Sequence, residues 1–123
     1  MKNILFTLLL TISFFTYGQK KELKQAQKLI DQEFYNEALD VLQNNKELIL
    51  SSDIKYQAHY YYLNGWALKE DSKSLKAVES LRKSIELERS IRQKKYIEDA
   101  NILIQNAEAE LVNSAVEDNK NDK

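Results

Sequence analysis

The chain of 123 residues has no cysteine and no proline, and it has only two glycines and one histidine. Without cysteine no disulfide can stabilise the fold, and Cys–His or multi-histidine metal sites are impossible within one chain. The scarcity of proline and glycine argues against β-sandwiches and barrels, which need frequent turns. Leucine, lysine, glutamate, glutamine and alanine are abundant and favour helices. The composition therefore predicts a single all-α domain.

Residues that could carry catalysis are also scarce. His59 is the only histidine, and no glycine elbow precedes a serine that could pair with it. The sequence has no glycine-rich phosphate loop and no calcium-binding loop. Acidic pairs such as Glu86 and Glu88 are interpreted as solvated, and an acid–base carboxylate pair is the one enzymatic alternative left open. We therefore expect a protein that is not an enzyme, with no catalytic residues, no metal and no cofactor.

No charge of one sign dominates the chain, whose formal net charge is −1. Nucleic-acid binding needs a basic surface, so this balance predicts no nucleic-acid partner. The local basic runs are Lys20-Lys21 and Arg92-Gln93-Lys94-Lys95. Both are interpreted as solvated helix faces or ends.

Residues 1–18 have the layout of a secretory signal peptide. Lys2 precedes an apolar run over residues 4–15, and the stretch ends at the small residue Gly18. An apolar helix of this length rises ~18 Å, short of the ~30 Å hydrocarbon core of a bilayer. We therefore expect cleavage before Gln19, export to the periplasm or the medium, and no membrane span afterwards. An uncleaved anchor is the alternative.

The stretch from Tyr56 to Leu68 organises the rest of the chain, because it combines five aromatic residues with Gly65. A glycine inside a helix costs about 0.5–1 kcal/mol relative to alanine, so its presence indicates that another backbone comes close. The helical pattern over residues 73–89 supplies that second helix, with Ala77 small enough to meet Gly65. The short polar link between the two patterns predicts an antiparallel hairpin.

These residues resemble the tetratricopeptide repeat, a helical hairpin of ~34 residues with the pattern W-x2-L-G-x2-Y…A-x3-F…P. The matching positions here are Tyr61, Asn64, Gly65 and Leu68, followed by Ala77 and Leu81. The final proline is replaced by Arg89. Twelve residues separate Gly65 from Ala77 and also Ala26 from Ala38, so the pattern occurs twice with an offset of 39 residues. We assign repeats to residues 19–52 and 58–91, with Ala26, Ala38, Gly65 and Ala77 as helix-packing residues.

The resemblance implies antiparallel hairpins stacked as a short right-handed α-solenoid. Residues 94–116 carry apolar side chains on one face only, which predicts a long capping helix over the second repeat. Residues 117–123 form a polar tail. Leu111 and Ala115 also resemble the second half of another first helix, so the chain is alternatively part of a longer array that self-associates through its open end. An ordinary charged C-terminus explains the tail equally well.

The family's first helices line a concave groove, and this resemblance implies where a partner binds. The matching positions are Leu23, Gln27, Ile30 and Asp31 in the first repeat and His59, Tyr62, Trp66, Lys69 and Glu70 in the second. Tyrosine and tryptophan are enriched at binding hot spots. The sequence thus predicts a noncatalytic interaction scaffold of the cell envelope that binds a partner peptide or helix. The alternative for Tyr62 and Trp66 is packing against the C-terminal helix.

Overall fold

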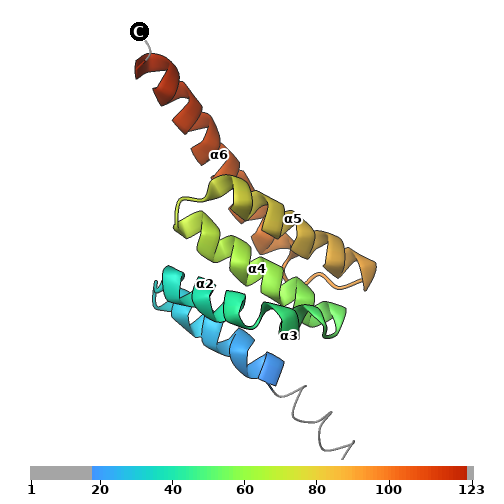
Figure 1. Ribbon diagram of the computed structural model, residues 1–123. Coiled ribbons are helices and arrows are strands. Elements are labelled where there is room, and N and C mark those ends of the chain that lie inside the picture. The colour runs from blue at the N-terminus through green and yellow to red at the C-terminus, as the bar shows by residue number, and fades with distance from the viewer. Residues whose placement is uncertain (1–17, 122–123) are drawn as a thin grey trace, which may run out of the picture.

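The computed structural model describes residues 18–121, and within this range every regular element is a helix (Figure 1). The helices are residues 18–31, α2 (Tyr35–Asn44), α3 (Lys46–Leu50), α4 (Ile54–Glu70), α5 (Ser74–Ser90) and α6 (Ile97–Asn121). The predicted all-α class is therefore confirmed. The predicted signal segment lies outside the described residues except for Gly18.

The chain contains two helical hairpins, and the first helix of each ends in the same kind of hydrogen-bonded turn. These first helices are residues 18–31 and α4. Glu33 and Ser72 have positive φ angles of 64° and 60°. The Phe34 N–H donates to the Leu29 carbonyl at 2.8 Å, and the Lys73 N–H donates to the Leu68 carbonyl at 2.9 Å. This is the Schellman arrangement, which satisfies the last carbonyls of a helix. Each residue of the second turn lies 39 positions after its equivalent in the first. The backbone therefore repeats with the same offset of 39 residues as the sequence.

Gly65 lies at a close approach between α4 and α5. A Cβ atom built on Gly65 would lie 2.5 Å from Leu81 Cγ and 3.2 Å from the Ala77 carbonyl oxygen. The first distance is shorter than real Cβ contacts and the second is tight, so a side chain at this position requires Leu81 or α5 to shift. Ala77 is fully buried beside this crossing, and Ala26 and Ala38 are fully buried in the first hairpin.

Serines on α5 strengthen the same contact. Ser84 Oγ donates to the Ala58 carbonyl at 2.7 Å, and Ser80 Oγ donates to the Tyr61 carbonyl at 2.8 Å. Because serine is short, it lets two backbones come close and also hydrogen-bonds across the gap. The α4–α5 interface therefore combines apolar packing with buried hydrogen bonds.

The second helix of the first hairpin is interrupted, which the sequence did not predict. Asn45 separates α2 from α3 with φ −112° and ψ 11°. Its side-chain Nδ2 donates to the Val41 carbonyl at 2.7 Å. A side chain that bonds to a nearby carbonyl competes with the regular helical pattern, which accounts for the break at this residue.

The C-terminal helix differs from its prediction at both ends. α6 begins at Ile97 rather than at residue 94, and it continues through the expected polar tail to Asn121. Only Ala100, Ile104 and Ala107 are buried on it, and every described residue from 108 onward is exposed. Leu111, expected on the docked face, is 38% exposed. The first half of α6 packs against α5, whereas the second half projects beyond the other helices (Figure 1).

Gly65→Leu tests the close crossing. The new side chain would displace Leu81 and separate α4 from α5, so we expect the free energy of unfolding to fall by about 2–4 kcal/mol. Urea denaturation followed by circular dichroism measures this change. Ala109→Leu, a small-to-large change on the exposed part of α6, is the matched control and should change stability by less than ~0.5 kcal/mol. Equal stability of the Gly65 variant and the wild type would contradict the crossing.

Candidate functional site

The rings of His59 and Tyr62, two of the predicted contact residues on α4, are covered by the ring of Tyr96, which lies in the segment before α6. The Tyr96 ring stacks on His59, with centroids 4.9 Å apart, and on Tyr62, with centroids 4.8 Å apart. The Trp66 ring lies beside that of Tyr62, with centroids 5.8 Å apart. Such stacked pairs add about 0.5–1.5 kcal/mol beyond the area that they bury. The rings of His59 and Tyr62 therefore contact Tyr96 of the same chain.

Glu88 holds Tyr96 in this position. The Tyr96 N–H donates to Glu88 Oε1 at 2.8 Å, and the Tyr96 carbonyl accepts the Ala100 N–H at the start of α6. The carboxylate thus lies at a helix N-terminus, where a negative charge is stabilised. Glu88 is fully buried, and its Oε2 has no hydrogen-bond partner among residues 18–121. The interpretation of Glu88 as a solvated residue was wrong, because Leu81, Ile85 and Glu88 share the buried face of α5.

The side chains of His59, Tyr62 and Tyr96, which we call the aromatic cluster, are uncharged at neutral pH. Burial, followed by the nearby charge of Lys95, lowers the pKa of His59 to about 4. Burial raises the pKa of Tyr62 to about 12, with Asp99, Tyr96 and Asp31 adding to the effect. Burial and the charge of Glu88 raise the pKa of Tyr96 to about 12 as well. None of these three groups titrates near pH 7, so none has the pKa near neutrality that suits a general acid or base.

Three of the predicted contact residues belong to the core. Leu23 is 1% exposed, Ile30 is 2% exposed and Tyr62 is 7% exposed, so none of these side chains offers contact area to a partner. The reason is that all three pack in the hydrophobic core between the helices. His59, Gln27 and Trp66 are half-buried, and Gln27 Nε2 donates to Asp31 Oδ1 at 3.0 Å. Trp66 is thus the large predicted residue that retains an accessible surface.

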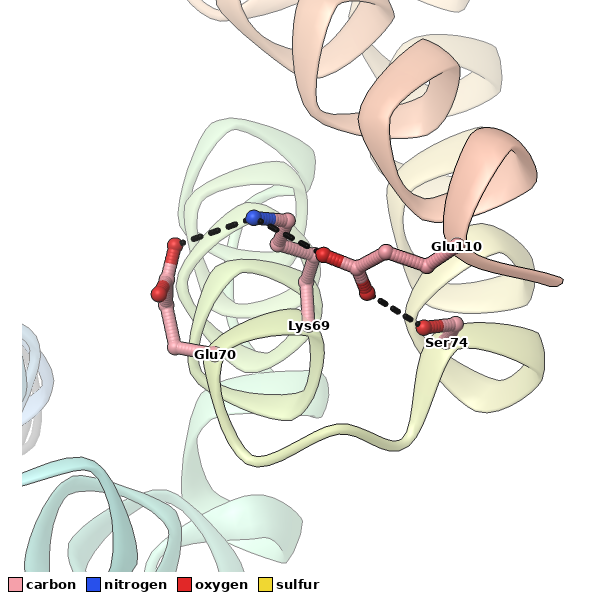
Figure 2. Close-up of polar contacts among 4 residues, drawn as sticks. All are labelled: Lys69, Glu70, Ser74 and Glu110. Atoms are coloured by element: carbon pink, nitrogen blue, oxygen red, sulfur yellow. Dashed lines mark hydrogen bonds and ion pairs between the residues drawn. The ribbon is translucent and has the colours of Figure 1, made fainter. Parts of the chain in front are cut away.

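Lys69 and Glu70 belong to a polar network that joins three helices (Figure 2). Lys69 Nζ lies 3.3 Å from Glu110 Oε1 and 3.4 Å from Glu70 Oε1. Ser74 Oγ, in the first turn of α5, donates to Glu110 Oε2 at 2.8 Å. Burial opposes protonation of Lys69, but the two carboxylates outweigh it and raise the pKa of the ammonium. The network fixes the middle of α6 over the α4–α5 turn, and sequence reasoning missed Glu110 because its partners are distant along the chain.

Other kinds of site have no counterpart in the described part of the chain. Residues 18–121 contain no group of three or more His, Asp or Glu side chains arranged to hold a metal ion. In the same range, no helix combines the length and the apolar character needed to cross a bilayer. Comparison of the chain with family models, with curated proteins and with solved structures found no match in any of the three.

The titration of His59 tests the aromatic cluster. Because it is the only histidine, its proton resonances are unambiguous. We expect a midpoint near pH 4 rather than near the usual 6.5. Tyr96→Ala should expose the ring and raise the midpoint toward 6.5, whereas Tyr56→Ala should leave Tyr96 stacked and the midpoint low. A wild-type midpoint near 6.5 would contradict the burial of His59 beneath Tyr96.

The same shift makes stability depend on pH. The pKa of His59 is lower in the folded chain, so the unfolded chain binds the extra proton between pH 6.5 and about 4. Neutral His59 therefore contributes fully to the free energy of unfolding above pH 6.5, and this contribution is lost as the pH falls toward 4. Urea denaturation of the wild type and of His59→Gln at several pH values measures this effect. The difference between the two plots of unfolding free energy against pH is the part due to His59.

Proposed function

We propose that this protein is a noncatalytic interaction module that binds a segment of a partner protein along the first helices of its stacked hairpins. The supporting geometry is the pair of hairpins related by 39 residues, with the same turns at Glu33 and Ser72. Small buried residues at equivalent positions of each hairpin add to this support. These features agree with a short right-handed tetratricopeptide-like solenoid, an architecture whose extended surfaces serve binding.

The observation that carries this proposal is the position of Trp66. It is a large aromatic residue in the middle of α4 that is only partly buried, although its neighbours Tyr62 and Leu63 are buried. Tryptophan at an accessible, rigidly packed position is a typical hot spot, because it gives a large contact area at little entropic cost. Gln27 and Glu70 complete the contact surface proposed here, while Ile30 and Tyr62 support it from below. Lys69 serves mainly to fix α6 through Glu110.

The proposed location is outside the cytoplasm, in the cell envelope or secreted. It rests on the apolar run over residues 4–15 and the small residue at its end. Gln19, the first residue after the proposed cleavage position, lies in the first turn of the helix of residues 18–31 and is 8% exposed. The mature chain would therefore begin directly at the helical domain, without a linker.

Trp66→Ala tests the partner surface. With a photoreactive residue at Glu70, we expect one discrete crosslinked partner in envelope extracts. Trp66→Ala should reduce its recovery at least ~10-fold, because hot-spot truncation costs about 2 kcal/mol or more. Leu75→Ala, on an exposed position of α5, is the control and should leave recovery unchanged. Equal recovery with both folded variants would remove Trp66 from the site.

Self-association is the second candidate function, and the projecting half of α6 favours it. Leu111, Val112 and Val116 are 38%, 61% and 46% exposed on this half. An antiparallel pair of such helices centred near residue 114 would place Val112 of one copy against Val116 of the other. Exposed apolar side chains grouped on one helix are typical of surfaces that bury themselves on assembly.

Sedimentation equilibrium distinguishes this second candidate. If α6 pairs, the apparent mass should rise with concentration, and Val112→Asp/Val116→Asp should abolish the rise. Asn106→Asp/Asn113→Asp adds the same two charges to exposed positions of α6 and should retain the rise. A wild-type mass that stays at the monomer value over the whole concentration range would exclude self-association through α6.

A further inference from the structure

Five cationic side chains gather around the segment that joins α5 to α6. All five are exposed, and none forms an ion pair with a carboxylate within the described residues 18–121. They are Lys55, Arg89, Arg92, Lys94 and Lys95. The chain as a whole is close to neutral, with a net charge of −1, so this end of the molecule carries a local positive potential.

Three adjoining cavities follow this segment, and Gln93 lines all of them. Their volumes are about 650, 270 and 560 Å³. We call them together the basic trough. The middle cavity is lined by three lysines, Lys55, Lys94 and Lys95, and by no carboxylate. The rings of Tyr56, His59 and Tyr96 form the rest of its wall.

The trough is held in shape by Glu88 and by the aromatic rings. The Glu88 carbonyl accepts the Gln93 N–H at 2.9 Å, and its carboxylate accepts the Tyr96 N–H at 2.8 Å. Lys55 Nζ lies 5.0 Å from the centre of the Tyr56 ring, and Lys95 Nζ lies 5.4 Å from the centre of the Tyr96 ring. Cations placed over aromatic faces are partly ordered before a ligand arrives, which lowers the entropic cost of binding.

The charges at the two ends of the trough differ from those at its middle. Asp53 lines one end cavity together with Lys55, and Glu98 lines the other together with Arg89, Arg92 and Lys94. A continuous phosphate backbone would meet a carboxylate at each end, whereas a peptide can place neutral residues there and an acidic residue between the lysines of the middle cavity. The rings also offer apolar contacts that suit the methylene groups of a peptide side chain.

We propose that the basic trough binds an extended acidic segment of a partner protein, with a glutamate or aspartate carboxylate seated between Lys55, Lys94 and Lys95. The cavities on either side accommodate the neighbouring residues of that segment. This surface includes none of Gln27, Trp66 and Glu70, so the inference does not depend on the partner surface proposed above.

Fluorescence anisotropy with labelled oligoglutamate at low ionic strength tests the trough directly. We expect the wild-type full chain to bind oligoglutamate and to ignore oligoglutamine of the same length. Lys55→Gln/Lys94→Gln/Lys95→Gln should weaken binding at least ~10-fold, because it removes the cations around the middle cavity. Lys20→Gln/Lys24→Gln/Lys28→Gln removes the same charge from exposed positions of the first helix and should weaken binding less than ~2-fold. Circular dichroism checks that both variants are folded.

Four outcomes would overturn the proposal. The first is equal affinity for oligoglutamate and oligoglutamine, and the second is equal loss of affinity in the two triple variants. The third is tighter binding of a single-stranded oligonucleotide through the same three lysines, which would assign the trough to nucleic acid. The fourth is full displacement of the peptide by inorganic phosphate at an equal concentration of charge, which would reduce the trough to a general anion site. Trp66→Ala should not change oligoglutamate binding, so failure of either surface can be recognised separately.

Discussion

The close approach of α4 and α5 at Gly65 is the constraint on which the structure depends. Because Leu81 occupies the space of a missing side chain, the two backbones lie near enough for Ser80 and Ser84 to hydrogen-bond to carbonyls of α4. α4 then presents its remaining faces to α2 and α3 on one side and to α6 on the other. A wider α4–α5 spacing would move α5, the segment that follows it and Tyr96, so the geometry of the aromatic cluster follows from a packing contact elsewhere on α4.

The sequence predicted the parts of the fold that depend on local spacing. The all-α class followed from composition, and the two hairpins followed from small residues twelve apart at 26 and 38 and again at 65 and 77. The ends of α6 and the interruption at Asn45 were missed. The start of α6 and the interruption depend on single hydrogen bonds, from Tyr96 to Glu88 and from Asn45 to Val41, and periodicity carries no information about them. Helix boundaries depend on such individual contacts more than on propensity.

The candidate site could be found from the sequence, but its exposure could not. Aromatic residues on one face of α4 indicated an important surface, yet the pattern is the same whether that face meets a partner or the chain itself. In the structure the face meets the chain itself, because Tyr96 covers the rings of His59 and Tyr62. Tyr96 is more than thirty positions away from both residues in the sequence. Glu88 was missed for a related reason. Its charge suggested solvent, although its spacing from Leu81 and Ile85 placed it on the buried face.

Tyr96 connects the two surfaces that we propose as binding sites for partners. Its ring covers His59 and Tyr62, which lie next to Trp66, and the same residue lines the middle of the basic trough. Its backbone is tied to the buried carboxylate of Glu88 and to the first turn of α6. A change at Tyr96 therefore alters both surfaces and the start of α6 together. Trp66 lies beside Tyr62 and lines none of the three cavities of the trough. Substitutions of Trp66 and of the trough lysines therefore change the two surfaces separately.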